Sequence, residues 1–117
     1  MDIERVVAQR LKDKTGIDAY LSVPVDPPDE FLTVEVVRTD VQSRFIPVYA
    51  LDVDVWAKDA HARARAHELA QKVIDETPNL DEEPNIFNPT FENCYRSPDA
   101  DTGRARYVVQ IECAVCE

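Results

Sequence analysis

A change of hydrophobic period between Tyr49 and Ile74 constrains this fold more than any other feature of the sequence. Up to Trp56 the side chains alternate in character, whereas beyond Asp59 the apolar residues recur at helical spacing. The alternating set is Tyr49, Leu51, Val53 and Val55 on one face and Val48, Ala50, Asp52, Asp54 and Trp56 on the other. The helical set is Ala62, Ala66, Leu69, Ala70, Val73 and Thr77. This segment therefore predicts a half-buried strand that runs into an amphipathic helix.

The rest of the chain extends this pattern to the order α-β-β-β-α-β-β. Helices are expected at residues 3–14 and 59–77, with Asp2 and Asp59 as N-caps and Gly16 as the stop of the first helix. Strands are expected at residues 19–23, 31–39, 45–57, 85–96 and 105–115. These elements predict one α+β domain over residues 1–117. Its mostly antiparallel sheet of about five strands would carry both helices on one face.

Prolines and polar runs mark the expected loops and irregularities. Residues 39–44 and 79–84 are expected to be polar loops, and Pro78 is expected to end the second helix. Pro89 predicts a bulge or an edge position in the fourth strand, because proline cannot donate a ladder hydrogen bond. In the second strand, Thr33, Glu35 and Val37 are expected on the face opposite to its apolar side chains.

The charge balance restricts the class of partner. The formal net charge is −10, with 23 acidic and 13 basic residues, which disfavours tight binding to nucleic acid or to anionic membranes. An acidic wall that repels passing DNA is compatible with this charge. The sequence has no apolar run of about 20 residues and no signal-peptide pattern at its N-terminus. A cytoplasmic protein without a membrane partner is expected.

Motifs for catalysis or cofactor binding are missing from the sequence. Cys113 and Cys116 are expected on opposite faces of the last strand, and no second cysteine pair completes a zinc site. His61 and His67 are six residues apart, which is not the spacing that places two imidazoles on one metal. The chain has only two glycines, too few for a phosphate-binding loop or a dinucleotide fingerprint. No cofactor, no metal and no enzymatic activity are expected.

Two pairs of charged residues have more than one interpretation. Asp52 and Asp54 share a strand face, so they are either paired catalytic carboxylates or part of a solvated or channel-facing surface, and the second is favoured. Arg63 and Arg65 fit an exposed helix surface, with Glu68 close enough to pair with Arg65. Alternatively, these arginines reach an acidic neighbouring subunit.

Two segments resemble a known family at residue level. The first is Val53-Asp54-Val55-Trp56-Ala57-Lys58-Asp59-Ala60 followed by Ala66-His67-Glu68-Leu69-Ala70, and the second is the turn from Pro98 to Tyr107 with its alternating final strand. Both are similar to the tail terminator, or tail completion, proteins of long-tailed bacteriophages. The layout of a short N-terminal helix, a strand and a polar loop is similar too, so the resemblance covers nearly the whole chain.

This resemblance implies a structural protein of the virion, assembled in the bacterial host cytoplasm. Six copies would form a ring on the head-proximal end of the tail tube protein, end its polymerisation and bind the head connector protein. Genomic DNA would pass through the lumen without specific binding, facing Asp52 and Asp54. The residues expected to contact neighbouring proteins are Gln42, Ser43, Arg44, Arg63, Arg65, Asp81, Glu82 and Glu83.

A second hypothesis comes from charge alone. Acidic clusters at residues 81–83 and 99–101, together with the net charge of −10, are typical of a small regulator that mimics nucleic acid or binds a basic partner. An enzyme that uses Asp52 and Asp54 is the third and weakest hypothesis, because the sequence indicates no substrate.

Overall fold

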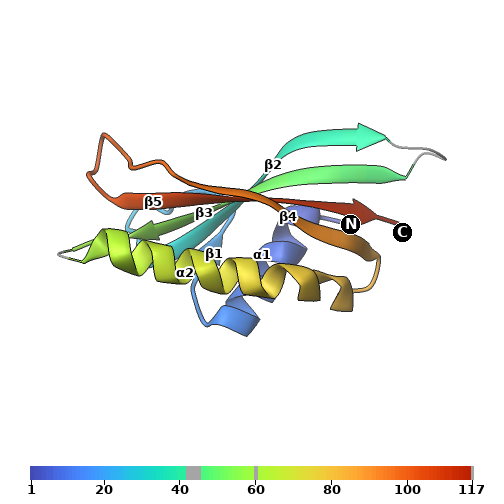
Figure 1. Ribbon diagram of the computed structural model, residues 1–117, viewed down its shortest axis with the longest axis horizontal. Coiled ribbons are helices and arrows are strands. Elements are labelled where there is room, and N and C mark those ends of the chain that lie inside the picture. The colour runs from blue at the N-terminus through green and yellow to red at the C-terminus, as the bar shows by residue number, and fades with distance from the viewer. Residues whose placement is uncertain (42–45, 60, 117) are drawn as a thin grey trace.

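A computed structural model describes residues 1–41, 46–59 and 61–116 of the chain. Figure 1 shows helices α1 and α2 lying along one side of a twisted sheet. The helices are α1, Ile3–Thr15, and α2, Ala62–Glu76, and a 3-10 helix follows at Thr77–Glu82. The strands are β1, Ala19–Tyr20; β2, Glu30–Val41; β3, Pro47–Ala57; β4, Ile86–Arg96; and β5, Ala105–Val115. The predicted α+β class and element order are confirmed.

The strands pair in the spatial order β1-β2-β3-β5-β4. Among the described strands, β1 and β2 pair in parallel, and the pairings β2–β3, β3–β5 and β5–β4 are antiparallel. After β3 the chain crosses the sheet as α2, enters β4 at the edge, and returns through β5 beside β3. The strand that ends the chain is therefore central, which explains why β5 is the most regularly alternating strand in the sequence.

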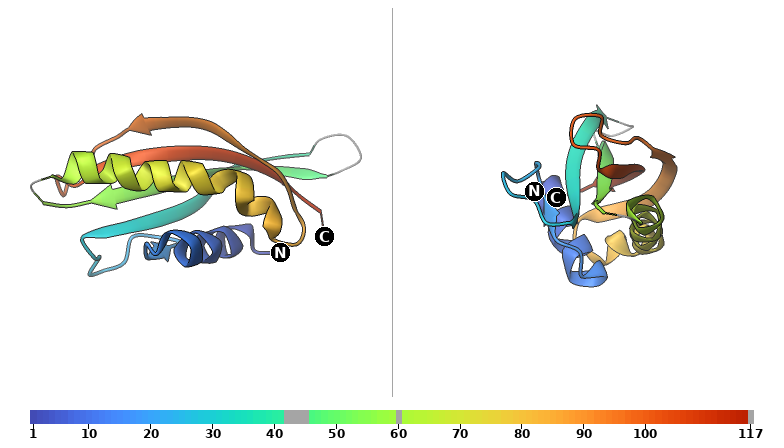
Figure 2. Two further views of the ribbon diagram at one scale, coloured as in Figure 1. Left: turned by 60° about the horizontal axis from the view of Figure 1, so that its bottom comes forward. Right: turned by 90° about the vertical axis from the view of Figure 1, so that its left-hand side faces the viewer.

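One hydrophobic core lies between the helices and the sheet. Its buried side chains include Val7 and Leu11 of α1, Leu69 and Val73 of α2, and Leu32, Val34, Leu51, Val53, Val55, Val109 and Ile111 of the sheet. These strand residues occupy every second position, as predicted, so they all point to the side that carries both helices. Burying each such side chain contributes about 1.5–3 kcal/mol. Within residues 1–41, 46–59 and 61–116, no helix lies on the opposite face of the sheet (Figure 2).

Both predicted ends of α1 are confirmed. The carboxylate of Asp2 accepts a hydrogen bond from the backbone N–H of Arg5 at 3.2 Å, which satisfies one free donor of the first turn. At the other end Gly16 has φ +76°, and its N–H donates to the carbonyl of Lys12 at 2.9 Å. The left-handed conformation ends the helix and turns the chain toward β1.

A Gly16→Ala variant is expected to lower the free energy of unfolding by about 1 kcal/mol. A Cβ added at Gly16 would have no heavy atom within 4 Å, so the loss arises from backbone conformation alone. Denaturant unfolding of the variant and the parent protein measures this difference. A gain in stability would contradict the left-handed geometry at this position.

The predicted N-cap of the second helix is wrong. The helix begins at Ala62, and His61 occupies the N-cap position without a side-chain hydrogen bond. Asp59 has φ +88° and contributes only its backbone carbonyl, which accepts from the N–H of Ala62 at 3.0 Å. The backbone adopts a left-handed conformation at Asp59, where the chain leaves the sheet for the helix layer. The helix therefore begins at Ala62 and not at residue 59, as the sequence predicted.

Three other boundaries differ from the prediction. Residues 79–84 are not simply a loop, because the 3-10 helix continues to Glu82 and fully buries Leu80. Pro78 lies in the first turn of that helix. A backbone N–H in the first turn has no hydrogen-bond partner within the helix, so a proline, which has no N–H, is tolerated there. Strand β1 has two residues instead of five, and β2 runs to Val41, so residues 39–41 pair with β3 instead of forming a loop.

Strand β4 is irregular and lies at the edge, as Pro89 predicted. Its pairing with β5 shifts register between Phe87 and Thr90 and again between Phe91 and Asn93. Asn88, just before the proline, has φ +52°. The third strand was expected from residue 45, but β3 begins at Pro47 and residue 45 lies outside the described residues.

Candidate functional site

The uncovered face of the sheet carries a short row of acidic side chains. The strand register places Glu35 of β2 opposite Asp52 of β3, and Thr33 opposite Asp54. Asp52 lies opposite Gln110 of β5, whose amide donates a hydrogen bond to its carboxylate at 3.2 Å. Asp52 and Asp54 are half-buried and share the face, as the alternation predicted. The carboxylates of Glu35, Asp52 and Asp54 therefore share one surface, which no helix of the described residues covers.

Asp54 is the electrostatically strained member of this row. Its pKa is raised to about 6, mainly because burial disfavours the charged form; Arg106 lowers the pKa, and the negative charges of Asp52 and Glu35 raise it. Near neutral pH the carboxylate is mostly ionised, and the face is at its most negative. A surface that repels a passing polyanion would have this sign of charge.

The raised pKa of Asp54 predicts a pH dependence of stability. Because the folded protein holds this proton more tightly than the unfolded chain, the contribution of Asp54 to stability is complete below pH 3.8 and is lost as the pH rises through about 6. An Asp54→Asn variant is therefore expected to lose less stability between pH 4 and pH 7 than the parent does. Urea unfolding across this range measures the slope, and identical slopes would contradict the prediction.

An aromatic and arginine cluster closes one end of the acidic row. The rings of Phe31 and Trp56 stack with centroids 5.5 Å apart, and the Trp56 indole N–H donates to the Thr33 hydroxyl at 3.1 Å. The Arg106 guanidinium lies 4.9 Å from the Trp56 ring, and that of Arg104 lies 5.5 Å from the Phe31 ring. Each guanidinium lies over the face of one aromatic ring, and these cation–π contacts stabilise the cluster.

A hollow of about 380 Å³ lies beside this cluster. The connection between β1 and β2 forms one wall with Leu21, Ser22 and Val23, and the sheet forms the other with Thr33, Glu35, Asp54, Trp56 and Arg106. Arg104 also donates to the backbone carbonyl of Pro28 at 3.0 Å, which ties the proline-rich connection to the sheet. The hollow is an open surface feature with an acidic floor.

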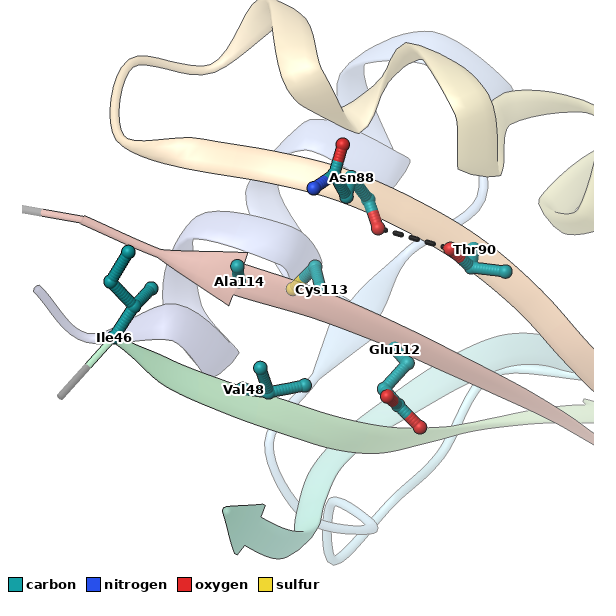
Figure 3. A pocket seen from close by; sticks show the side chains of 7 residues that line it. All are labelled: Ile46, Val48, Asn88, Thr90, Glu112, Cys113 and Ala114. Carbon is teal, nitrogen blue, oxygen red and sulfur yellow. Dashed lines mark hydrogen bonds between the residues drawn. The ribbon is translucent and has the colours of Figure 1, made fainter. Parts of the chain in front are cut away.

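A second hollow of about 320 Å³ lies at the other end of the face, beside the β4 bulge (Figure 3). It is lined by Ile46, Val48, Asn88, Thr90, Glu112, Cys113 and Ala114. The Thr90 hydroxyl donates to the Asn88 carbonyl at 3.1 Å, which holds the bulge. Burial raises the pKa of the Cys113 thiol to about 11, so this cysteine is not a nucleophile at neutral pH.

The described residues contain no group of three or more metal-ligating side chains. His61, at the N-cap position of α2, and His67, within the helix, are both exposed, and the His67 ring makes an edge contact with Tyr107, with the ring centroids 5.6 Å apart. Cys116 is exposed beyond the end of β5, whereas Cys113 is buried in the strand, so the two thiols are not paired. Neither helix in the described ranges has the length and apolar character needed to cross a bilayer.

Arg63 and Arg65, the contact residues expected on α2, differ in whether they bind acidic side chains of the same chain. Arg65 donates to both carboxylate oxygens of Glu30 and, at 3.0 Å, to Glu68. The predicted pairing of Arg65 with Glu68 is confirmed, and the bond to Glu30 joins α2 to the start of β2. Arg63 is exposed and, within the described residues, forms no ion pair.

Part of the acidic segment after α2 forms ion pairs with Arg10 of the same chain. Arg10 of α1 lies 2.6 Å from Glu82 and 3.6 Å from both Glu76 and Glu83. The hydrogen bond from Arg10 lowers the pKa of Glu82. Asp81 is exposed, and among the described ion pairs Arg10 is joined to Glu82 and Glu83 but not to Asp81. The predicted contacts Gln42, Ser43 and Arg44 lie outside the described residues.

Sequence reasoning missed Glu35 and Arg106 as neighbours of the two aspartates. The alternation in residues 31–39 gave the face of Glu35, but only the strand register brings it opposite Asp52. No family model matches this sequence, and no curated protein matches it.

Proposed function

We propose that this chain is a tail terminator protein of a long-tailed bacteriophage. Copies of it, six in the expected ring, cap the head-proximal end of the tail tube and stop the tube protein from polymerising. The ring then binds the head connector protein and joins tail to head in the virion, after assembly in the bacterial host cytoplasm. It acts as a structural protein and not as an enzyme.

The uncovered acidic face is the observation that carries this proposal. Both helices pack on one side of the sheet, and the other side presents Glu35, Asp52 and Asp54. In a ring with this face inward, the carboxylates would repel the DNA backbone and keep the genome from binding to the wall. Among the described residues, the arginine that lowers the pKa of Asp54 is Arg106, which is held over Trp56 and bonded to Ser97.

The decisive experiment measures tube length. Purified tail tube protein is polymerised with and without this chain, and the tubes are measured by negative-stain electron microscopy. Short tubes capped at one end support the proposal, and an unchanged length distribution refutes it. An Asp52→Lys/Asp54→Lys variant is expected to cap tubes but to retain DNA in a salt-sensitive manner, because lysines attract phosphates.

The alternative, a regulator that binds a basic partner through residues 81–83, has less support. Glu82 and Glu83 are held by Arg10, so they are less free to meet a partner than their sequence suggested. Reversing the charge of Asp81 alone separates the two functions. It would weaken binding to a basic partner if the regulator hypothesis holds, and it would leave tube capping unchanged if residues 81–83 play no part in it.

A further inference from the structure

We propose that a hollow beside the start of α2 binds the phosphate group of a small molecule. The hollow has a volume of about 590 Å³ and is lined by the beginning of α2 and by one residue of β5. The inference goes beyond the proposed function and does not depend on it. The described residues that line the hollow are His61, Arg63, Ala64, His67, Glu68 and Tyr107.

Four of these side chains can donate hydrogen bonds to an anion. Arg63 and His67 are four positions apart on α2, so they are neighbours on one face of the helix. His61 occupies the N-cap position, and its side chain makes no capping hydrogen bond. Tyr107 is half-buried, and its ring centroid lies 5.6 Å from that of His67. A guanidinium, two imidazoles and a phenol therefore meet at one hollow, which contains both histidines of the chain.

The charge of Arg63 is not offset by a carboxylate of the same chain. Arg63 is exposed and forms no ion pair among the described residues, whereas Arg65 donates to both Glu30 and Glu68. Glu68 is the carboxylate among the described lining residues, and the guanidinium of Arg65 at 3.0 Å offsets its charge. The hollow is therefore locally basic in a chain whose net charge is −10.

Charged groups on the neighbouring elements leave this basic character in place. Lys58 and Asp59, just before the helix, are both exposed and carry opposite charges. Arg96 of β4 lies opposite Tyr107 in the strand register, so it is on the same side of the sheet. Tyr107 also lies opposite Val55, a residue of the core under the helices. The hollow is therefore on the helix-covered side of the sheet, away from the acidic face.

The net charge restricts the anion to a small molecule. A nucleic acid presents many phosphates to the whole surface, and the 23 acidic residues of the chain would repel it. A single phosphate group meets mainly the hollow. Its three terminal oxygens can accept from Arg63 and from both imidazoles together, whereas a carboxylate has two oxygens and uses fewer of these donors.

A dependence on pH is expected from the two histidines. Histidine is the side chain that gains a positive charge as the pH falls from 8 to 5, so binding of an anion beside His61 and His67 strengthens in acid. Sulfate is the clearest probe of this effect, because it keeps its two charges over this range while phosphate gains a proton. Sulfate is expected to bind about tenfold more tightly at pH 5.5 than at pH 8.0.

Nuclear magnetic resonance tests the site on the full chain. Inorganic phosphate, sulfate and acetate are titrated separately at constant ionic strength, and the ring signals of the two histidines are followed. Both histidines are expected to shift along one saturating curve with phosphate and with sulfate, and much less with acetate. Histidine signals that do not move with phosphate, or an acetate curve equal to the phosphate curve, would overturn the proposal. A short DNA duplex that binds more tightly than phosphate would also overturn it.

Matched variants connect the signal to the hollow. Arg63→Gln is expected to weaken sulfate binding by about tenfold, and His67→Gln to reduce its pH dependence. Lys72→Gln is the control, because Lys72 is exposed on the same helix but is not among the described residues that line the hollow. Circular dichroism confirms that each variant is folded. Equal sulfate binding by Arg63→Gln and Lys72→Gln would show that only general charge attracts the anion, and the site would be refuted.

Discussion

Replacing Trp56 by alanine is expected to lower the free energy of unfolding by about 3–5 kcal/mol, the range for large buried aromatic residues. Trp56 is only 6% exposed although it lies on the face without helices. Its ring stacks on Phe31, carries Arg106 on its face, and donates its N–H to Thr33. Truncation removes all three contacts and leaves the Thr33 hydroxyl, itself 8% exposed, without its donor.

Urea or guanidinium unfolding of Trp56→Ala measures this loss. Tyr95→Ala is the matched control, because Tyr95 is also a large aromatic residue on a strand but is 42% exposed, and its loss is expected to be below about 1 kcal/mol. Trp56→Phe keeps an aromatic ring but not the N–H donor, so an intermediate loss is expected. Equal losses for Trp56→Ala and Tyr95→Ala would show that the aromatic cluster is not a structural anchor.

Replacing Arg10 by methionine is expected to lower the free energy of unfolding by about 2–3 kcal/mol. The Arg10 side chain is 11% exposed and lies among the carboxylates of Glu76, Glu82 and Glu83. Methionine fills a similar volume but leaves three negative charges facing one another, with Glu76 only 17% exposed. The loss therefore reflects uncompensated charge more than packing.

Thermal and urea unfolding compare Arg10→Met with Arg5→Met. Arg5 also pairs with an acid, Asp2, but its side chain is 75% exposed, so a change below about 0.5 kcal/mol is expected. Since Arg10 lowers the pKa of Glu82, the stability it provides through that group is present above pH 4.5 and is lost as the pH falls through the lowered value. A penalty that does not shrink in acid would contradict the charge explanation.

The strands and helices could be predicted because each follows one hydrophobic period. Strand β5 has the predicted bounds, since a central strand with one buried face alternates without interruption. The ends of α1 were predictable because Asp2 and Gly16 act through contacts within the same turn. Asp59 has the same capping chemistry, but the turn out of β3 decides where α2 begins, and that turn depends on how the two layers pack.

The prediction for the acidic segment at residues 81–83 was wrong for a different reason. Its composition indicated a free loop, yet Leu80 is buried in the core and Arg10 binds Glu82 from a helix about 70 positions earlier in the chain. The residues next to Glu82 in the sequence do not indicate that an arginine so far away in the chain binds it. The resemblance to tail terminators gave an expected function, which remains a prediction to be tested on tail tubes.

By itself, the sequence determined the α+β class, the element order and the shared face of Asp52 and Asp54. These properties depend on short-range periodicity, which any segment expresses without its neighbours. Only the tertiary structure decided that Glu35 joins the acidic row, that Arg106 lies over Trp56, and that β4 lies at an edge of the sheet while β5 lies inside it. These facts depend on strand order and register, which arise when residues far apart in the chain bury a common core.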